Sequence, residues 1–484
     1  MILKNLLVDI DYKIIKGHLN NDINGLCYDS RKAKTNYIFF AIKGFNVDGH
    51  KFIKKAIELG ANTIVLEELN EDYIFDGTII QVDDTKKAMS KIAINYYNKP
   101  ISKFNLYGIT GTNGKTTTSY LIKSILENTG DKVGLIGTIG NIIDGKFKKS
   151  THTTPESIDL QNIFNDMNKS NIDSCIMEVS SHSLALDRVY GNTFDTSIFT
   201  NLSKEHMDFH KDLDDYFDAK SKLFDMSKNC VINIDDHYGK KLYDKLIKDK
   251  NKKILSYSIN TKADIYATNI INDIDGASFL LNTDEGSINI KLHAPGIFNV
   301  YNALGACGAC LLNNISLTSM KEGFENINGV RGRFEVFKPK NNKFSVIIDY
   351  AHTPDGYENI FKTVDEFAKG KKTVIFGCGG DRDVTKRPIM GDLASNYNDL
   401  VILTTDNPRT EDPNKIILDI KKGIKKDNSI FIEDRKEAIE YAIKNAVENE
   451  VILVIGKGHE SYQLINNKVI EFNENEIIKN ALNM

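Results

Sequence analysis

The sequence contains no tryptophan and little proline or cysteine. Its 484 residues include only eight prolines and six cysteines. Six cysteines spread over such a length do not form the disulfide framework of a small secreted domain. No low-complexity tract is present, and no apolar run approaches the roughly 18 residues that a membrane helix requires. The start, MILKNLLVDIDYK, is a poor match to a signal peptide because acidic residues follow a very short apolar run.

The chain also lacks a strong charge of either sign. It has 66 acidic and 62 basic side chains, and its formal net charge is −4. A protein that coats nucleic acid needs a basic face, so we expect neither a nucleic-acid nor a membrane partner. Hydrophobic residues make up 41% and charged residues 26%, which is ordinary for a globular protein. We expect a monomeric, cytoplasmic protein of about three domains, at roughly 150 residues per domain.

Strand-like runs alternate with helical ones along most of the chain. Near the start, IFFAIKG (Ile38–Gly44) predicts a strand that ends at a glycine, and HKFIKKAIELGA predicts a helix closed by Gly60. The segment NKPISK around Pro100 is a predicted linker. Later runs such as SCIMEVS, FSVIIDY, KTVIFGCGG, DLVILTTD and EVILVIGKG are typical of buried strands. This alternation predicts an α/β fold with mostly parallel sheets, whose sites lie at the carboxyl ends of strands.

The strongest local motif is YGITGTNGKTTT, from Tyr107 to Thr118. A strand runs into glycines and then into a helix, an arrangement that makes a nest of backbone N–H groups for phosphate. Lys115 could reach the β- and γ-phosphates of a nucleotide, and Thr116 could place its hydroxyl on Mg²⁺. The spacing departs from the common phosphate-loop pattern because Ile109 stands five residues before Gly114. The alternative is a glycine turn before a surface helix, and the loop alone does not choose between a switch, a motor and a ligase.

Two further segments carry groups that could act on a nucleotide. MEVSSHSLALDR follows an apolar run and places Glu178 at a strand end, where phosphate-loop enzymes often hold the acidic partner of Mg²⁺. The segment TNLSKEHMDFHKDLDDYFDAKSKLF contains His206, His210 and many acidic residues. Taken singly, Glu178 could be solvated, and the second segment could be an acidic surface loop before an amphipathic helix.

Taken together, these segments resemble the Mur ligase family. The resemblance is carried in family order, over about residues 28 to 460, by TGTNGKTT, THTTPES, MEVSSHSLALDR, TNLSKEHMDFH, YFDAK, GIFNVYNALGA, RGRFE, DYAHTPDG, GGDRD, DNPR and GKGHE. It implies an ATP-dependent ligase of peptidoglycan precursor synthesis. Within the family, the pattern is similar to members that add meso-2,6-diaminopimelate to the D-glutamate γ-carboxylate of UDP-N-acetylmuramoyl-L-alanyl-D-glutamate (UDP-MurNAc-L-Ala-D-Glu) through an acyl phosphate.

The resemblance also implies three domains. These are a small α/β acceptor-binding domain at 1–100, a central phosphate-loop ATPase-like domain at 101–332, and a C-terminal Rossmann-like domain for the amino acid at 333–484. The positions that match ATP-binding residues are Thr110, Gly111, Thr112, Asn113, Gly114, Lys115, Thr116, Asn299, Asn302, Arg333 and Asp349, with His352 close by.

The resemblance further assigns catalytic and metal-binding roles, which fall to Lys115, Glu178, His206 and Lys220. Thr116 and Glu178 would share one Mg²⁺, and His206 would help to hold a second. The family's Asp-His pair appears here as Glu205-His206. Lys220 matches a lysine that the family carries as an N-carbamate (N6-carboxylysine), since CO₂ converts a cation that repels the metal into an anion that supports it.

Both remaining substrates have matching positions. Those for the acceptor are Ser30, Thr153, Thr154, Ser180 and Arg188. Those for the amino acid are Arg382, Asp406, Asn407, Pro408, Arg409, Gly456 and Glu460. Diaminopimelate has a distal carboxylate that lysine lacks, and Arg409 offers forked donors for it, while Glu460 could pair with the distal ammonium. Arg188 could bind a substrate anion or form a surface ion pair.

Three alternatives remain open at this stage. The same ligase could add L-lysine, or the chain could be a nucleotide-dependent switch or binding protein. A folate polyglutamate-type ligase is a nearer relative, but it should lack the DNPR and GKGHE pair. The C-G-A-C run at Cys307 and Cys310 has no second cysteine pair or nearby histidine to support zinc, so we expect it to pack within a helix.

Overall fold

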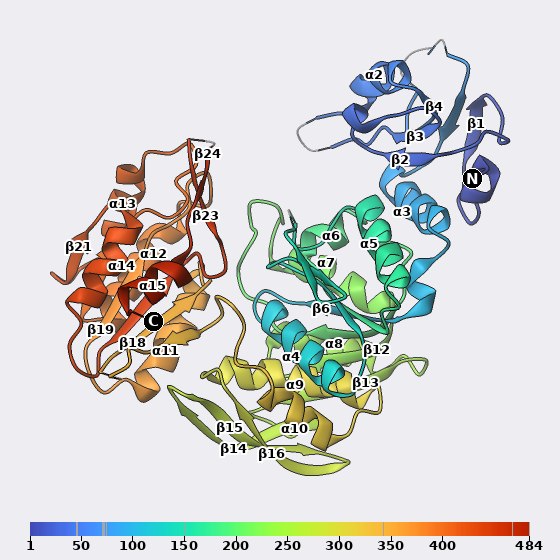
Figure 1. Cartoon of the computed structure of the whole chain (residues 1–484). Helices are drawn as coiled ribbons and strands as arrows, with labels where there is room; N and C mark the ends of the chain where they lie inside the picture. The colour runs from blue at the N-terminus through green and yellow to red at the C-terminus, as the bar shows by residue number, and fades with distance from the viewer. Residues whose placement is uncertain are drawn as a thin grey trace.

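Three successive stretches of the chain each form a large β-sheet with helices against it. The computed structural model describes residues 1–44, 47–69, 73, 75–150, 152–341, 343–466 and 468–483. Figure 1 shows the N-terminal (blue) and C-terminal (orange to red) regions on either side of the central region. Within the described residues, no helix has the length and apolar character needed to cross a membrane. The predicted α/β fold is confirmed.

The N-terminal sheet has five strands in the order β1-β5-β4-β3-β2, and only β1 runs antiparallel to its neighbour. Its elements are α1 (Leu3–Leu6), β1 (Lys13–Lys16), β2 (Gly25–Cys27), β3 (Tyr37–Phe40), α2 (Ile53–Glu58), β4 (Ala61–Leu66), β5 (Thr78–Gln81) and α3 (Thr85–Tyr96), with 3₁₀ turns at Ser30–Lys32 and Gly49–Phe52. The helix predicted to stop at Gly60 is confirmed. The predicted strand Ile38–Gly44 is too long, because Ile42 N–H donates to Phe40 C=O and the chain leaves the ladder.

The predicted linker around Pro100 is an ordered connection between the first two sheets. Asn98 and Lys99 adopt the left-handed conformation, with φ of 57° and 52°. A 3₁₀ turn, Pro100–Lys103, follows. Pro100 is buried, and its carbonyl accepts a hydrogen bond from the Asn168 side chain at 2.9 Å. The N-terminal region is therefore fastened to the central one at this point.

The central sheet has eleven strands in the order β16-β15-β14-β13-β12-β11-β6-β10-β7-β8-β9. Its strands are β6 (Asn105–Thr110), β7 (Val133–Ile136), β8 (Asn141–Ile143), β9 (Lys146–Lys148), β10 (Ser174–Glu178), β11 (Phe194–Phe199), β12 (Ser227–Asn233), β13 (Lys253–Ser258), β14 (Ile265–Asp273), β15 (Gly276–Thr283) and β16 (Gly286–Leu292). The prediction of parallel strands is right for β7, β10, β6, β11, β12, β13 and β14. Both edges are antiparallel hairpins that the sequence analysis did not anticipate.

Helices cover both faces of this sheet (Figure 1). They are α4 (Lys115–Asn128), α5 (Ser157–Lys169), α6 (Ser181–Ala185), α7 (Leu213–Asp225), α8 (His237–Leu246), α9 (Ile297–Leu311) and α10 (Leu317–Glu325). Cys307 and Cys310 are buried in α9 with free thiols. A Cβ at Gly308, between them, would lie 2.5 Å from Val231 of β12. The C-G-A-C run is therefore the close packing face of a helix, as predicted.

The C-terminal sheet has six strands in the order β17-β18-β22-β19-β20-β21, and only the edge strand β17 is antiparallel. Its strands are β17 (Glu335–Phe337), β18 (Ser345–Asp349), β19 (Lys372–Phe376), β20 (Leu400–Leu403), β21 (Ser429–Phe431) and β22 (Val451–Ile455), followed by the hairpin β23 (Tyr462–Ile465) and β24 (Lys468–Glu471). Its helices are α11 (Pro354–Phe367), α12 (Lys386–Tyr397), α13 (Pro413–Lys421), α14 (Arg435–Lys444) and α15 (Glu474–Ala481). The motifs DYAHTPDG, GGDRD, DNPR and GKGHE all follow carboxyl ends of these parallel strands.

Candidate active site

The phosphate loop joins β6 to the first turn of α4. Gly114 is the N-cap of α4 and has φ of 88°, a conformation that favours glycine. The Lys115 ammonium folds back and donates to the carbonyls of Gly111 and Thr112, both at 2.8 Å. Thr112 N–H donates to the Asn201 carbonyl at 2.9 Å. The loop is thus held in shape by the segment after β11, and Lys115 lies over it, where phosphate oxygens would approach.

Gly114→Ala should distort this loop. A Cβ at Gly114 would lie 2.3 Å from Asn302 Oδ1, so either the loop or α9 must move. We expect the KM for ATP to rise at least about tenfold and the free energy of unfolding to fall by roughly 1–3 kcal/mol. Steady-state kinetics and thermal unfolding measure both.

The matched control for this substitution is Gly145→Ala. Gly145 also has a left-handed backbone, with φ of 69°, but no atom lies within 4 Å of its added Cβ. It therefore carries the backbone strain without the collision. Equal effects of the two substitutions on the KM for ATP would contradict the assignment of Gly114 to the phosphate site.

Glu178 lies at the end of β10, as predicted, and its side chain is fully buried rather than solvated. Its Oε2 accepts hydrogen bonds from the hydroxyls of Thr116, at 3.0 Å, and Thr138, at 2.8 Å, while its Oε1 accepts from Thr138 N–H at 2.9 Å. Arg333 Nη2 donates to the same Thr116 hydroxyl at 3.2 Å. A carboxylate and a hydroxyl in contact are oxygen donors of the kind that Mg²⁺ prefers. These two residues fit a Mg²⁺ that also binds phosphate oxygens and water.

Lys220 lies in α7 with a buried side chain. Its Nζ donates to the Gly111 carbonyl at 2.8 Å and lies 4.5 Å from the centre of the Tyr216 ring. Burial lowers the pKa of Lys220 well below its usual value, the charge of Lys115 lowers it further, and Glu205 opposes both. A lowered pKa favours the neutral amine, which is the form that reacts with CO₂.

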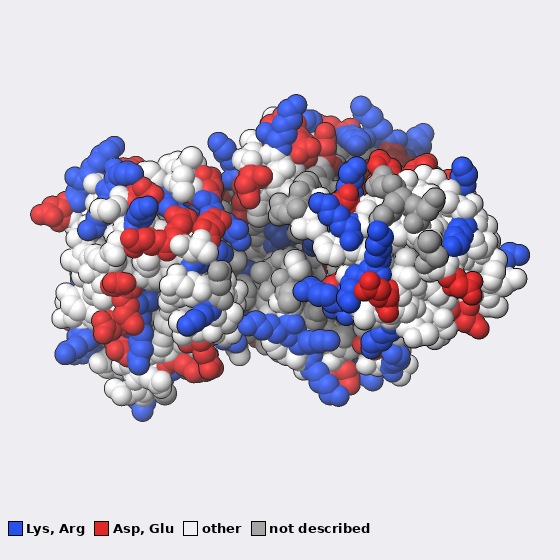
Figure 2. Space-filling view, turned by 90° about the horizontal axis from the view of Figure 1, so that it is seen from above, with Lys and Arg blue, Asp and Glu red and all other residues white. Residues whose placement is uncertain are grey.

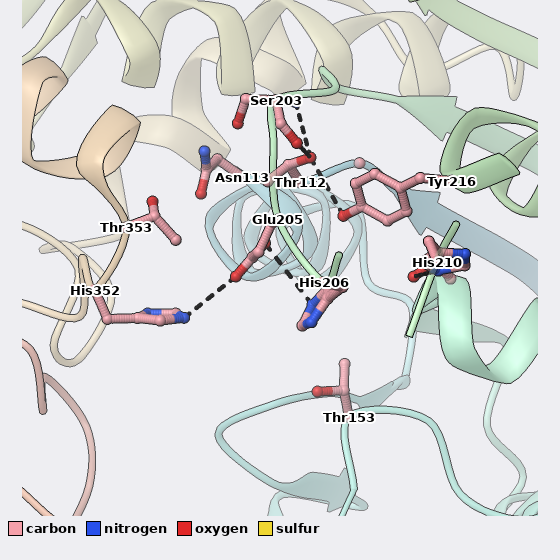
Figure 3. Close-up of polar contacts among 12 residues, drawn as sticks. Thr112, Asn113, Thr153, Ser203, Glu205, His206, His210, Tyr216, His352 and Thr353 are labelled. Atoms are coloured by element: carbon pink, nitrogen blue, oxygen red, sulfur yellow. Dashed lines mark hydrogen bonds and ion pairs between the residues drawn. The ribbon is translucent and has the colours of Figure 1, made fainter. Parts of the chain in front are cut away.

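Glu205 connects the central region to the C-terminal one (Figure 3). Its Oε1 lies 3.3 Å from His352 Nε2, and its Oε2 lies 3.8 Å from His206 Nε2. Burial raises the pKa of Glu205, but the hydrogen bond from His352 and the charges of His206 and Lys115 outweigh it, so the pKa falls well below its usual value. Burial also lowers the pKa of His206. Glu205 is therefore a charged carboxylate with a histidine on either side.

The residues predicted to bind metal fall into two groups. Across the described residues, no group of three or more His, Cys, Asp and Glu side chains is arranged to hold a metal ion. Thr116 and Glu178 are in contact and fit one Mg²⁺, as described above. The predicted second site relies on His206 and Lys220, and an unmodified lysine does not fit it because ammonium repels a cation. That site requires the carbamate.

The two residues predicted to bind the adenine side contact each other, since Asn302 Nδ2 donates to Asn299 Oδ1 at 3.3 Å. Asn299 lines a pocket between α4, α10 and the start of α9, together with Leu121, His293, Phe324 and Arg333. Asn302 also lies against the phosphate loop, since a Cβ at Gly114 would be 2.3 Å from its Oδ1, and the same oxygen accepts from the Thr118 hydroxyl at 3.4 Å. The guanidinium of Arg333 stacks 4.5 Å from the Tyr350 ring centre.

Asp349, the last of the predicted ATP-binding residues, contacts backbone on both sides. Its two carboxylate oxygens accept from the N–H groups of Phe334 and Ala351, both at 2.7 Å. Burial raises its pKa, while Arg333 and these hydrogen bonds oppose the rise. Asp349 therefore fixes the backbone segment that contains Arg333.

Four of the five predicted acceptor residues lie beside Glu178. The Thr154 hydroxyl donates to the Glu178 carbonyl at 2.9 Å and accepts from Ser180 N–H at 3.1 Å. Arg188 donates to the Thr154 carbonyl at 3.1 Å and pairs with Glu156 at 2.7 Å. Thr153 Oγ1 lies 3.1 Å from Thr138 Oγ1. The fifth, Ser30, is buried in the 3₁₀ turn of the N-terminal region, and Thr151, the first residue of the THTTPES motif, lies outside the described residues.

The predicted amino-acid residues occupy three neighbouring loops, after β19, β20 and β22. The Arg409 side chain donates from Nη1 to the Gly380 carbonyl in the GGDRD loop. The backbone N–H of Arg409 donates to the Leu464 carbonyl at 3.0 Å. Pro408 also lies against this loop, since a Cβ at Gly380 would be 2.0 Å from the Pro408 carbonyl oxygen. Arg382 Nη1 donates to the carbonyl of Asp381 in the same loop.

The GKGHE loop completes the group. Asn407 Nδ2 donates to Glu460 Oε2 at 2.9 Å. A Cβ at Gly456, which has φ of 116°, would lie 3.0 Å from Asp406 Oδ2. The structure therefore brings DNPR, GGDRD and GKGHE together.

Three residues near the site escaped the sequence analysis. Thr138 holds both oxygens of Glu178, and Tyr216 lies between Thr112 and Lys220. Asp355 Oδ2 accepts from Asn113 Nδ2 and from the Ser203 hydroxyl, both at 3.1 Å. Asp355 belongs to α11, so it links the C-terminal region to the phosphate loop. The available signals were the position of Asp355 in the DYAHTPDG motif and the position of Thr138 two residues after β7.

This arrangement is that of a multidomain nucleotide-using enzyme, with a phosphate loop, a buried carboxylate and a facing domain whose loops reach both. Three family models match consecutive parts of the chain: "Mur ligase family, catalytic domain" at residues 22–97, "Mur ligase middle domain" at 109–310, and "Mur ligase, glutamate ligase domain" at 332–458. The chain belongs to the Mur ligase family.

Relatives match over the whole length. UDP-N-acetylmuramoyl-L-alanyl-D-glutamate–2,6-diaminopimelate ligase 1 of Clostridium acetobutylicum is 48% identical over 99% of this chain and 98% of its own. The enzyme of that name in Clostridioides difficile is 49% identical over 100% of this chain and 99% of its own. A solved structure of a ligase of the same name is 30% identical, covers 100% of this chain and 99% of its own, and superposes with a TM-score of 0.71.

Proposed function

We propose that this chain is the ATP-dependent ligase that joins meso-2,6-diaminopimelate to the D-glutamate γ-carboxylate of UDP-MurNAc-L-Ala-D-Glu. Full-length similarity to ligases of that name supports the proposal. The observation that carries it is the assembly of three C-terminal loops around Arg409 and Glu460, while His352 and Asp355 of the same region contact the phosphate-loop side. The C-terminal region can thus bind the amino acid and also contact the nucleotide site.

The chemistry starts with phosphoryl transfer from ATP to the γ-carboxylate, which gives an acyl phosphate and ADP. Lys115 and the N–H groups of the phosphate loop would hold the β- and γ-phosphates, and Thr116 and Glu178 would hold Mg²⁺. When bound, Mg²⁺ neutralises charge on the transferring phosphoryl group. The amine of diaminopimelate then attacks the acyl carbonyl, and the tetrahedral intermediate collapses to the amide and phosphate. Water must be excluded from the acyl phosphate meanwhile.

Lys220 takes part as its N-carbamate. The neutral amine adds to CO₂, forms an N–C bond and releases one proton, so that a carboxylate replaces the ammonium. That carboxylate, with His206, would supply oxygen and nitrogen donors for a second Mg²⁺. The lowered pKa of Lys220 and its burial beside Tyr216 support this role.

The regions divide the substrates. We assign the acceptor's nucleotide end to residues 1–100 with Ser30, ATP to 101–332 and the amino acid to 333–484. Thr153, Thr154, Ser180 and Arg188 lie next to Glu178 and would hold the peptide end of the acceptor near the γ-phosphate. Figure 2 shows a hollow between the C-terminal region and the rest, with lysine and arginine side chains along its rim. We propose that the enzyme acts on these small, anionic substrates as a monomer in the cytoplasm.

Dependence of ATP consumption on the other two substrates separates the ligase from a nucleotide-dependent switch. With purified protein and Mg²⁺, ADP should form rapidly only when UDP-MurNAc-L-Ala-D-Glu and the amino acid are both present. ADP formation that ignores both substrates would favour the switch.

Arg409→Ala should weaken diaminopimelate binding specifically. Its guanidinium belongs to the DNPR loop and donates to the Gly380 carbonyl of the GGDRD loop. A bidentate pair with the distal carboxylate is a strong, charge-assisted contact. We expect the KM for diaminopimelate to rise about 30-fold or more, with the KM for ATP changed less than about threefold. Arg31→Ala, at an exposed pair with Asp29, is the matched control. An unchanged KM for diaminopimelate would remove Arg409 from the pocket.

A further inference from the structure

Lys457 is a buried cation between two of the motifs, and nothing above gives it a role. It follows β22 and lies in GKGHE, and its side chain is 0% exposed. Its Nζ donates to Asn407 Oδ1 at 3.0 Å and to Glu460 Oε2 at 2.8 Å. An ammonium group with no access to water must be compensated by such partners. Both partners belong to the set proposed above to bind the amino acid.

Asn407 closes a triangle with these two residues. Its Nδ2 donates to Glu460 Oε2 at 2.9 Å, and its Oδ1 also accepts from Leu464 N–H at 2.9 Å. These contacts fix the orientation of the Asn407 amide. Its oxygen accepts from the Lys457 ammonium and from Leu464 N–H, and its nitrogen donates to the Glu460 carboxylate. DNPR, GKGHE and β23 are joined through this one cluster.

The triangle also decides which part of Glu460 faces a ligand. Lys457 and Asn407 both bind Oε2, so Oε1 is the oxygen left for an incoming ammonium group. Tyr462 borders the cluster, with its ring centre 5.7 Å from Lys457 Nζ and 4.7 Å from Lys149 Nζ of the central region. The cluster thus lies where the C-terminal region meets the central one.

We propose that Lys457 is a positioning residue for the amino-acid pocket. It holds the Asn407 amide and the Glu460 carboxylate in one fixed geometry, and its positive charge lies against the negative charge of Glu460. It does not touch the substrate. This inference rests on the proposed function, because it concerns the pocket assigned there to diaminopimelate.

The opposing view is that Lys457 only stabilises the fold. The two views differ in what they change. A stabilising lysine alters the free energy of unfolding and leaves the KM values of the folded enzyme alone. A positioning lysine raises the KM for the amino acid, because a ligand must then reorder Asn407 and Glu460 on binding, while the ATP and acceptor sites keep their KM values.

Lys457→Met tests this difference, since it keeps an unbranched side chain only one atom shorter and removes the charge. We expect the KM for the amino acid to rise at least tenfold, with the KM for ATP and for the acceptor changed less than threefold. Thr373→Val is the matched structural control: Thr373 is fully buried at the other end of the same sheet, where its hydroxyl bonds to Glu450 at 2.6 Å. It should lower thermal stability and leave all three KM values within threefold.

An amino-acid KM that stays within threefold in Lys457→Met overturns the proposal, as does an equal rise in all three KM values. If Lys457→Met does not fold, the double variant Lys457→Met/Glu460→Gln, which removes both charges, is measured against Glu460→Gln alone. A further tenfold rise supports the positioning role, which acts through Asn407 as well, and no further rise overturns it. The wild-type chain is assayed first with diaminopimelate and with L-lysine, and the better substrate is used. A wild type that ligates neither contradicts the proposed function itself, which is a separate result.

Discussion

Lys220→Ala is expected to lower the rate of ligation about 10³-fold or more at saturating substrates. The substitution removes the proposed carbamate, and with it a metal-binding carboxylate at the point where phosphoryl charge develops. Loss of one preorganised group that stabilises such charge typically costs 10²–10³-fold, and loss of a metal adds to this. Lys220 is buried against the Gly111 carbonyl and Tyr216, so alanine also leaves a space that a small anion can fill.

That space makes chemical rescue the decisive part of this prediction. Acetate or formate at high concentration should restore part of the activity of Lys220→Ala, because a free carboxylate can stand where the carbamate stood. Lys222→Ala, on the exposed side of the same helix, should keep near wild-type activity and show no response to added carboxylate. Full activity of Lys220→Ala without any added carboxylate would refute the carbamate role.

Glu178→Gln is expected to have the second largest effect, a fall in kcat of about 10²–10³-fold. Glutamine has the same shape and can still accept from Thr138 N–H, so the fold should change little. It loses the negative charge that, with Thr116, is proposed to hold Mg²⁺. The Mg²⁺ concentration needed for half-maximal rate should therefore rise several-fold.

Glu127→Gln is the control for Glu178→Gln. Glu127 lies on the exposed surface of α4 and pairs with Lys123, so its loss should leave both kcat and the Mg²⁺ requirement unchanged. A Glu178→Gln enzyme with a normal Mg²⁺ requirement and a normal kcat would show that Glu178 only fastens Thr116 and Thr138.

Most of the fold could be predicted because buried parallel strands have a strong sequence signature. Apolar runs such as those of β10 and β22, each bounded by turn residues, identified strands correctly, and Gly60 correctly marked the end of α2. The antiparallel edges of the central sheet could not be placed in the same way. Their strands are short or half-exposed, and their hairpins rest on turns such as Asp144-Gly145, both with positive φ. The turn residues can be recognised in the sequence, but only the pairing of the strands shows to which edge of the sheet each hairpin belongs.

Candidate site residues could be named from the sequence where they belong to a motif with known chemistry. Residues whose role depends on tertiary contacts could not be named in this way. The resemblance assigned Glu178, Lys220 and Arg409 by their motifs. In the structure, Glu178 contacts Thr116, Lys220 contacts the Gly111 carbonyl and Arg409 contacts the Gly380 carbonyl. Thr138 and Asp355 have no chemistry of their own that marks them in a sequence. Their importance comes from which atoms they touch, namely the Glu178 carboxylate and the phosphate-loop Asn113. Such contacts depend on the packing of distant segments.

The central claim is tested most directly by weighing the product. The purified protein is incubated with ATP, Mg²⁺ and UDP-MurNAc-L-Ala-D-Glu, with either meso-diaminopimelate or L-lysine, and the products are identified by mass spectrometry. We predict an acceptor heavier by one diaminopimelate residue, formed with one ADP per amide, and far slower product formation with lysine. Equal or faster formation of the lysine product would contradict the specificity assigned to Arg409, and no amide product with either amino acid would contradict the proposed ligase activity.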